Sequence, residues 1–435
     1  MAAETILVSS SVKPARRWAE VLPRGRFWSL FAAVLLFNVG VAVYFFLYNL
    51  FMLDLGYREG PLGVLAGALA FGSMAGTIPM GFVAQRLGAR RTLVTCLLAV
   101  SIAFGARLFL LWYPMQVAFA FCDGVLLCGW AVCLSPAVAS IVEERRRPAA
   151  FSILFAAAVA AGSLGGFLGG NLPDWCHAAA QHWWRIAISS TDAKRATLLA
   201  ACCLTCVAAW PVARGSAIQQ EFTGVASHSW IRRPPSFLKR YLIASACWAG
   251  AVGAFNPFTN VFFVRYVGVA TAHLGNFFAV AQLLQAAAVL CVPLLLRRTG
   301  IVGGIVTMQA ATAVAVALLS AGRGIVTEEF LYCALMAAQH MCDPAMQTLL
   351  MDRVPPSLRN GASALNFLAV SLAQSAAATV SGAAIQRFGY PAVLAAIAVA
   401  VLMAAAGFRL LMPRESAVQA GELSGPVDPT PASAA

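Results

Sequence analysis

Long runs of apolar residues dominate the chain, and short polar stretches containing Arg, Gly or Pro separate them. A helix needs roughly 20 residues, at 1.5 Å of rise per residue, to cross a bilayer core about 30 Å thick. This length divides the chain into twelve apolar segments, at 28–51, 61–84, 92–112, 115–141, 149–171, 196–213, 239–264, 274–296, 301–321, 329–351, 361–385 and 390–412. The pattern therefore predicts an all-α membrane protein with twelve transmembrane helices.

The stretches outside these segments are short, with four exceptions. Residues 1–27 lack the apolar core of a signal peptide, so we expect a cytoplasmic tail before an uncleaved first helix. Residues 172–195 are expected to form a loop, and the Ala-, Ser- and Pro-rich residues 413–435 a disordered cytoplasmic tail. The chain is then expected to divide into a first helical bundle, a cytoplasmic linker and a second bundle, at 28–213, 214–238 and 239–412.

Composition excludes a water-soluble protein. The chain is 60% hydrophobic and 11% charged, against about 45–50% apolar and about 25% charged residues in soluble domains. Eleven of the twelve cysteines fall in apolar segments, and only Cys176 lies in a predicted loop. No extramembrane disulfide is therefore expected.

Basic residues indicate how the chain sits in the membrane. The formal net charge is +13, and 22 of the 30 lysines and arginines lie in the two tails or after the even-numbered segments. Positively charged loops stay on the cytoplasmic side, so we expect a multi-pass protein of the plasma (inner) membrane with both termini cytoplasmic. The basic excess is then an orientation signal, and a nucleic-acid partner is not expected.

The two halves of the chain share a pattern when one is displaced by 212 residues. Glycines, arginines and one leucine recur at matching helix ends, as the pairs Gly56 and Gly268, Leu62 and Leu274, Gly63 and Gly275, Arg86 and Arg298, Gly88 and Gly300, Arg147 and Arg359, and Gly170 and Gly382. Such a parallel repeat is typical of transporters whose halves are related by a pseudo-twofold axis along the membrane normal. We therefore expect two pseudo-symmetric six-helix bundles.

The layout resembles the major facilitator superfamily from about residue 28 to residue 412. The most specific local similarity is the sequence GFVAQRLGARR at 81–91, which is similar to the family pattern G-x-x-x-D-R-x-G-R-R. The resemblance implies a gating loop, with the residues Gly81, Gln85, Arg86, Gly88, Arg90 and Arg91. Gln85 replaces the family Asp, which joins the halves by a charge contact, so a weaker or different latch is expected here. The second copy, LRRTG at 296–300, keeps the arginines and Gly300.

Ionisable residues inside the predicted helices are costly in a bilayer, and they commonly mark functional sites. Asp123, His340 and Asp343 are the candidates for proton coupling. Asp123 has two interpretations: a proton carrier or substrate counter-charge, or a structural partner of Arg107 at a similar depth. Asp343 is either a protonatable site or a contact of the cytoplasmic gate, and His340 is either titratable or a satisfied buried side chain.

Other polar and aromatic residues indicate a substrate cavity. The resemblance implies that the first, fourth, seventh and tenth helices line it, and Pro257 predicts a bend in the seventh. The candidate cavity residues are Asn38, Tyr48, Asn49, Asp123, Trp130, Asn256, Asn260, Gln282, Gln339, His340, Asp343 and Asn366. Each alone is compatible with helix–helix contact, and together they suggest an amphipathic, aromatic cavity without strong charge.

Several other site classes are not expected. Gly162, Gly166 and Gly170 favour close helix packing over an antiporter motif, since the Gly-Pro step of that motif is missing. Asp174, Cys176, His177 and His182 match no standard zinc spacing, so no metal is expected. No nucleotide-binding or hydrolase motif is present, which argues against a cofactor or an enzyme.

These patterns predict a transporter that moves a small organic solute by alternating access. We expect a monomer embedded in lipid and coupled to protons, with efflux of an amphipathic compound favoured over uptake of a highly charged metabolite. The alternative is a transporter-like sensor that signals through a partner without net transport.

Overall fold

The computed structural model describes residues 25, 27–143, 146–185, 188–214, 236–322, 324–354 and 359–412. Most of the predicted tails 1–27 and 413–435, and most of the linker 214–238, lie outside the described residues. In the described part, the regular structure consists of helices.

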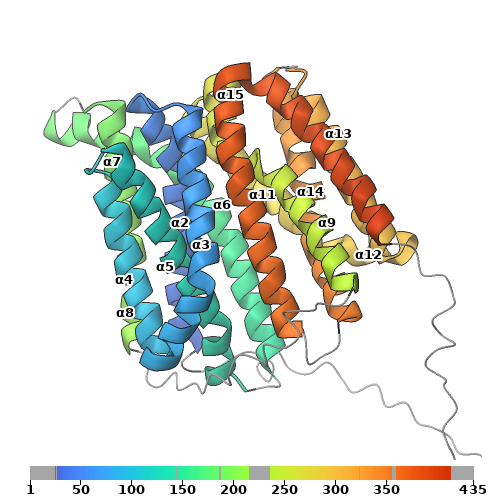
Figure 1. Ribbon diagram of the computed structural model, residues 1–435. Helices are drawn as coiled ribbons and strands as arrows, with labels where there is room; N and C mark the ends of the chain where they lie inside the picture. Colours follow the sequence, from blue (N-terminus) through green and yellow to red (C-terminus); the bar gives the residue numbers. More distant parts are fainter. Residues whose placement is uncertain are drawn as a thin grey trace, which may run out of the picture.

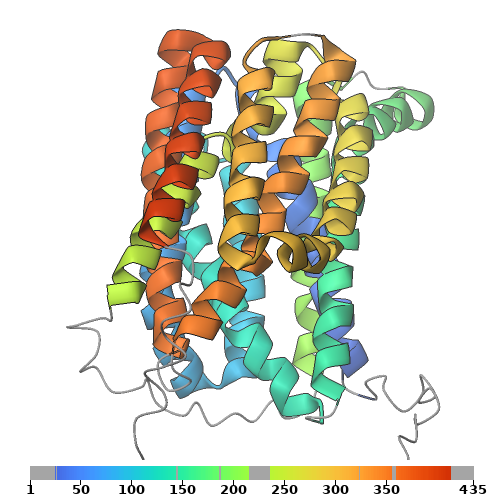
Figure 2. The ribbon, with the colours of Figure 1, turned by 90° about the vertical axis from the view of Figure 1, so that its right-hand side faces the viewer.

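The first half of the chain forms six helices where the sequence predicts them. They are α2 (Phe27–Asp54), α3 (Glu59–Leu87), α4 (Ala89–Arg107), α5 (Tyr113–Ile141), α6 (Arg147–Ala179) and α7 (Ser190–Val207), the last extended by α8 (Ala209–Arg214). The long helices run roughly along one direction in both views (Figures 1 and 2).

The second half follows the same plan with more interruptions. Its elements are α9 (Ser236–Gly253), η4 (Asn256–Phe258), α10 (Thr259–Val261), η5 (Phe262–Val267), α11 (Thr271–Leu290), α12 (Val292–Thr299), α13 (Ile301–Leu319), α14 (Ile325–Arg353) and α15 (Arg359–Leu411). α15 covers the last two predicted segments, which meet at Gly389, where φ is 78°. Length and composition would let nine described helices cross a membrane, with Gly361–Leu411 counted as one.

The seventh predicted segment is bent, as Pro257 predicts. Pro257 lies in the 3₁₀ turn η4, after which the chain continues through α10 and the π-helical turn η5. Proline has no N–H to donate and its ring disturbs the preceding turn. The interruption frees backbone groups at the middle of the bundle, where other helices contact them.

The prediction of a loop at 172–195 is wrong for its first part. α6 continues to Ala179 and the π turn η2 (Ala180–Trp184) follows directly. This end of α6 turns across the direction of the other helices (Figures 1 and 2), and this helix contains Pro173, a residue type that kinks helices. Trp175 and Trp183 are exposed there, which is typical of aromatic side chains at a membrane interface.

The 212-residue repeat is visible in the backbone. Gly56 and Gly268 have φ of 88° and 83°, and Gly88 and Gly300 have φ of 82° and 72°. These left-handed conformations favour glycine, so corresponding turns require the same residue. Arg147 and Arg359 also make corresponding bonds, since their Nε atoms donate to Val142 O at 3.3 Å and to Val354 O at 3.2 Å, respectively.

The two halves meet through two equivalent helix pairs, α3 with α15 and α6 with α11. Figure 1 shows α3 and α15 side by side. A Cβ atom added to Gly63 would lie 3.0 Å from Gly382 Cα, and one added to Gly275 would lie 2.6 Å from Gly170 Cα. The displacement of 212 residues converts one contact into the other, so the pseudo-symmetry includes the interface between the halves.

Candidate functional site

A cavity of about 560 Å³ lies between the two halves. Its lining residues come from α2, α3, α4, α5 and α6 on one side and from the seventh segment and α11 on the other. They are Ala42, Phe45, Phe46, Tyr48, Asn49, Leu65, Ala66, Leu69, Ala70, Ser73, Arg107, Leu127, Gly162, Gly166, Asn256, Pro257, Thr259, Asn260, Phe278 and Gln282. Volumes of 300–1,000 Å³ are typical of small-molecule sites.

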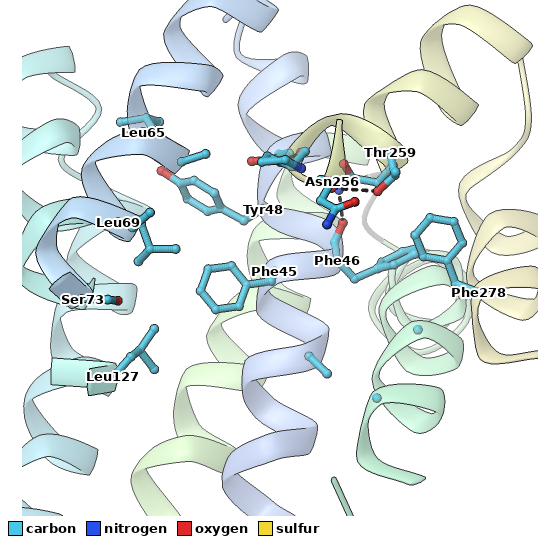
Figure 3. A pocket seen from close by; sticks show the side chains of 18 of the residues that line it. Phe45, Phe46, Tyr48, Leu65, Leu69, Ser73, Leu127, Asn256, Thr259 and Phe278 are labelled. Atoms are coloured by element: carbon cyan, nitrogen blue, oxygen red, sulfur yellow. Dashed lines mark hydrogen bonds between the residues drawn. The ribbon is translucent and has the colours of Figure 1, made fainter. Parts of the chain in front are cut away.

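Aromatic and aliphatic side chains form most of the surface of this cavity. Phe45 extends from α2 toward Leu69 of α3 and Leu127 of α5 (Figure 3). On the other side of α2, Phe46 meets Phe278 edge to face, with their ring centroids 5.6 Å apart. Such walls bind apolar and aromatic groups by burying their surface.

Two asparagines close one end of the cavity. In an intact helix Pro257 O would accept a bond from the N–H of Val261, but Asn260 Oδ1 accepts that bond at 2.9 Å. Pro257 O instead accepts a hydrogen bond from Asn49 Nδ2 at 2.8 Å, and Asn260 Nδ2 donates to Phe46 O at 2.7 Å. The bend in the seventh segment therefore supplies backbone and side-chain groups that join it to α2.

A buried polar network borders the cavity. Arg107 Nη1 donates to Asp123 Oδ2 at 2.8 Å, and its Nε donates to Gln116 Oε1 at 3.1 Å. Tyr48 OH donates to the same Gln116 oxygen at 2.5 Å, and the Arg107 Cζ lies 4.3 Å from the centroid of the Tyr48 ring. Arg107 is the charged member that lines the cavity, while Asp123 lies behind it, fully buried.

The structure shows that Asp123 and Arg107 form an ion pair, and it favours the structural interpretation of Asp123 in this conformation. Asp123 Oδ1 is buried and accepts no hydrogen bond from the described residues. The pair is therefore incompletely satisfied, and a buried carboxylate in that condition is destabilised.

Five of the candidate cavity residues line the cavity together, namely Tyr48, Asn49, Asn256, Asn260 and Gln282. Seven others lie outside its lining, namely Asn38, Asp123, Trp130, Gln339, His340, Asp343 and Asn366.

Local contacts explain several of these positions. Asn38 Nδ2 donates to Val34 O of its own helix at 2.7 Å. Trp130 packs on Phe37 with 4.5 Å between ring centroids, and Asn366 Oδ1 accepts a bond from Ser245 Oγ at 2.8 Å.

The three candidates on α14, Gln339, His340 and Asp343, divide between the core and the surface. Gln339 is buried. His340 Nδ1 lies 3.3 Å from Asp343 Oδ2, and the Asp343 side chain is 66% exposed. The three residues therefore do not meet in the cavity in this conformation.

Sequence reasoning missed several lining residues. Arg107 carries a signal in the sequence, because it is a charge within an apolar segment, but that signal indicates only pairing with Asp123 and not a position in the cavity wall. Phe45, Phe46 and Phe278 had none, since aromatic residues that face a cavity, a core or lipid look alike in sequence.

The predicted gating loop connects α3 to α4 through Gly88. Arg90 donates to Ala213 O in α8, a contact within the first half. Gln85, Arg86 and Arg91 are exposed, and Gly81 is half-buried. Their role as a latch stays a prediction.

The sequence model of the Major Facilitator Superfamily matches residues 30–338. The chain belongs to this superfamily. Membership identifies an integral membrane transporter rather than an enzyme, and the prediction of two pseudo-symmetric six-helix bundles is confirmed.

Solved structures of transporters share the fold of this superfamily member. The nucleoside transporter NupG superimposes with a TM-score of 0.73 at 13% identity, covering 89% of this chain and 99% of that chain. A bacterial homologue of the human lysosomal transporter Spinster, in an inward-facing and occupied conformation, gives 0.71 at 14%, covering 88% and 96%. A D-xylose-proton symporter gives 0.67 at 15%, covering 89% and 97%. No match to a curated protein is found.

Proposed function

We propose that this transporter carries a small organic solute across the plasma (inner) membrane by alternating access around the cavity described above. The observation that carries the proposal is that the cavity lies between the two halves and that inter-half contacts close it at one end. In alternating access, the rocking of the halves would break these contacts and form others at the opposite end.

The closing contacts are polar as well as close-packed. Glu59 and Arg265 form an ion pair between the halves, with 3.2 Å between Oε1 and Nη1. Asn171 Nδ2 donates to Asn276 Oδ1 at 2.8 Å, and Ser375 Oγ donates to Gly67 O at 2.7 Å. All of these lie in the part of the bundle nearest the turns at Gly56 and Gly268.

Farther along α3, toward Gly88, a glycine packs against α5 of the same half and not against α15 of the other half. A Cβ added to Gly76 would lie 2.9 Å from Val125 Cα in α5, within the same half. α3 thus changes partner from α15 to α5 toward Gly88, which supports an opening at that end. With the orientation expected from the basic residues, this end is cytoplasmic and the conformation is inward-open.

A covalent link across the closed end is expected to stop transport. Cysteines introduced by N171C and N276C replace two hydrogen-bonded side chains of opposite halves, so a short thiol cross-linker should join them. Substrate flux in proteoliposomes should fall at least about tenfold after cross-linking and recover when a cleavable linker is reduced. The wild type treated in the same way controls for the native cysteines. Undiminished flux in the fully cross-linked variant would contradict alternating access at this interface.

Proton coupling is the second part of the proposal, and the geometry favours Asp123 among the three candidates. Asp123 is buried beside the one charged residue that lines the cavity in the described part of the chain. His340 and Asp343 contact each other away from that lining. A proton bound to Asp123 would change the charge next to the substrate, as coupling requires.

Asp123→Asn is therefore expected to abolish solute accumulation driven by a pH gradient, while Asp343→Asn and His340→Gln retain it. The amide keeps the size of Asp123 but binds no proton in this range. Accumulation in proteoliposomes with and without an imposed pH gradient measures the effect, and exchange without a gradient tests whether each variant still moves solute. Gradient-driven accumulation by Asp123→Asn would transfer the coupling role to another group.

A further inference from the structure

Arg107 lines the cavity, and one nitrogen of its guanidinium donates no hydrogen bond to a described residue. Two nitrogens of Arg107 donate hydrogen bonds, Nε to Gln116 and Nη1 to Asp123, and Nη2 donates none to a described residue. Among the described residues that line the cavity, Arg107 is the charged one, and the others are aromatic, aliphatic or neutral and polar. A planar guanidinium presents paired N–H groups that match a carboxylate.

We propose that the transported solute is an amphipathic monocarboxylate, bound by Arg107 and carried with one proton on Asp123. This assignment rests on the proposed transport cavity. Asp123 competes with the solute for Arg107, since its Oδ2 occupies Nη1. Protonation at Oδ1, which accepts no hydrogen bond from the described residues, neutralises Asp123 and frees Nη1 to join Nη2 in binding the incoming carboxylate.

Charge is conserved through this exchange. The empty site contains the Arg107 cation and the Asp123 anion, and the loaded site contains the same cation, a neutral Asp123 and the solute anion. A proton and a monoanion therefore enter together, and both leave together. Transport is then electroneutral, and it responds to the pH gradient and not to the membrane potential.

The surroundings of Asp123 are compatible with this role. The other ionisable side chains that act on it electrostatically are Tyr44 and Tyr48 of α2, Arg107 of α4 and Cys202 of α7. Arg107 is the cation in this set, so neutralisation of Asp123 affects the charge balance of Arg107 directly. Among the residues that the structure describes, no second cation lines this cavity, which disfavours dianions.

The apolar lining selects the rest of the solute. Phe45, Leu69 and Leu127 face the space beside Tyr48 (Figure 3), and the ring of Tyr48 packs under the guanidinium. An aromatic or branched body against these side chains, with its carboxylate on Arg107, satisfies both parts of the site.

A matched set of three compounds tests the assignment by calorimetry of the purified protein at pH 7.5. N-acetylphenylalanine is the anion, N-acetylphenylalaninamide its neutral isostere and 2-phenylethylamine a cation. We expect the acid to bind at least about tenfold more tightly than either of the other two compounds. Titrations in two buffers of different ionisation enthalpy should show uptake of about one proton per acid bound.

Three variants keep the test decisive. D123N should bind the acid without proton uptake, and the double variant R107Q/D123N, which leaves neither charge unpaired, should bind acid and amide equally. R387Q removes an exposed arginine that does not line the cavity, and it should behave as the wild type. Four results would each overturn the assignment. For the wild type these are equal binding of acid and amide, tighter binding of the cation, or no binding of the acid, and for D123N the result is proton uptake. Cross-linking at the closed end tests alternating access separately, so either idea can fail alone.

Discussion

Gly63→Leu and Gly275→Leu are each expected to reduce transport roughly a hundredfold by preventing closure of the cavity end that is shut here. A Cβ on Gly63 would lie 2.5 Å from Ala378 O, and a Cβ on Gly275 would lie 2.5 Å from Gly166 O. Both obstacles are backbone atoms of the opposite half, so no side-chain rotation relieves them. A penalty of about 3 kcal/mol on one conformation corresponds to roughly a hundredfold change in its population.

The same substitution at an open position separates this effect from a general loss of stability. Gly105 and Gly407 also lie in helices, but an added Cβ there meets no atom within 4 Å, so Gly105→Leu and Gly407→Leu should transport normally. Distances between spin labels on the Gly56 end of α3 and the Gly389 end of the first half of α15 should lengthen in Gly63→Leu and stay unchanged in the controls. Wild-type flux with wild-type distances in Gly63→Leu would show that this contact is not needed.

The glycines of this interface show how far the sequence could predict the fold. Their matching positions in the two halves were visible as a repeat, because turns and close helix contacts both require a residue without a side chain. The apolar segments and the bend at Pro257 could also be predicted, since membrane thickness and proline chemistry constrain them locally. Which helix each glycine touches could not be predicted, because that depends on packing between distant segments.

The cavity was harder to predict than the fold. Asn49 and Asn260 were identified as polar residues within helices, but their binding to backbone carbonyls of the opposite half depends on the local break at Pro257. Phe45 and Phe278 carry no distinguishing signal in a chain that is 60% hydrophobic. Asp343 was expected in the same cavity because of its depth along a helix, yet rotation about that helix places it elsewhere.

The choice between two roles for Asp123 shows the same limit. Sequence placed Asp123 and Arg107 at similar depth, and only the structure shows their atoms 2.8 Å apart. The pair does not by itself exclude a proton on Asp123, because Arg107 also faces the cavity and can bind a different anion. Structural pairing and proton coupling are therefore compatible for this residue in different states of one transport cycle.

The energetic consequence of this pairing is the second large effect, and it is expected in stability. Arg107→Met leaves a fully buried carboxylate without its partner, and Asp123→Leu leaves a buried guanidinium uncompensated, so each should cost about 3–5 kcal/mol. The double variant Arg107→Met/Asp123→Leu should recover most of this loss, because two apolar side chains replace two charges that had both been desolvated. Thermal unfolding of the detergent-purified proteins should place both single variants well below the wild type and the double variant close to it.

The ion pair between Arg195 and Asp192 provides the comparison. Its atoms are 3.3 Å apart, and its side chains retain 29% and 56% of their exposure, so water screens both charges. Arg195→Met and Asp192→Leu should each cost about 1 kcal/mol or less from loss of the pair, with little recovery in the double variant. Equal coupling in the two pairs would mean that burial does not control the strength of the Arg107–Asp123 interaction. Strong coupling at Arg107 and Asp123 alone would show that the bundle keeps an energetically costly charge pair beside its cavity. Helix packing does not require such a pair. A function in binding and proton exchange explains why it is present.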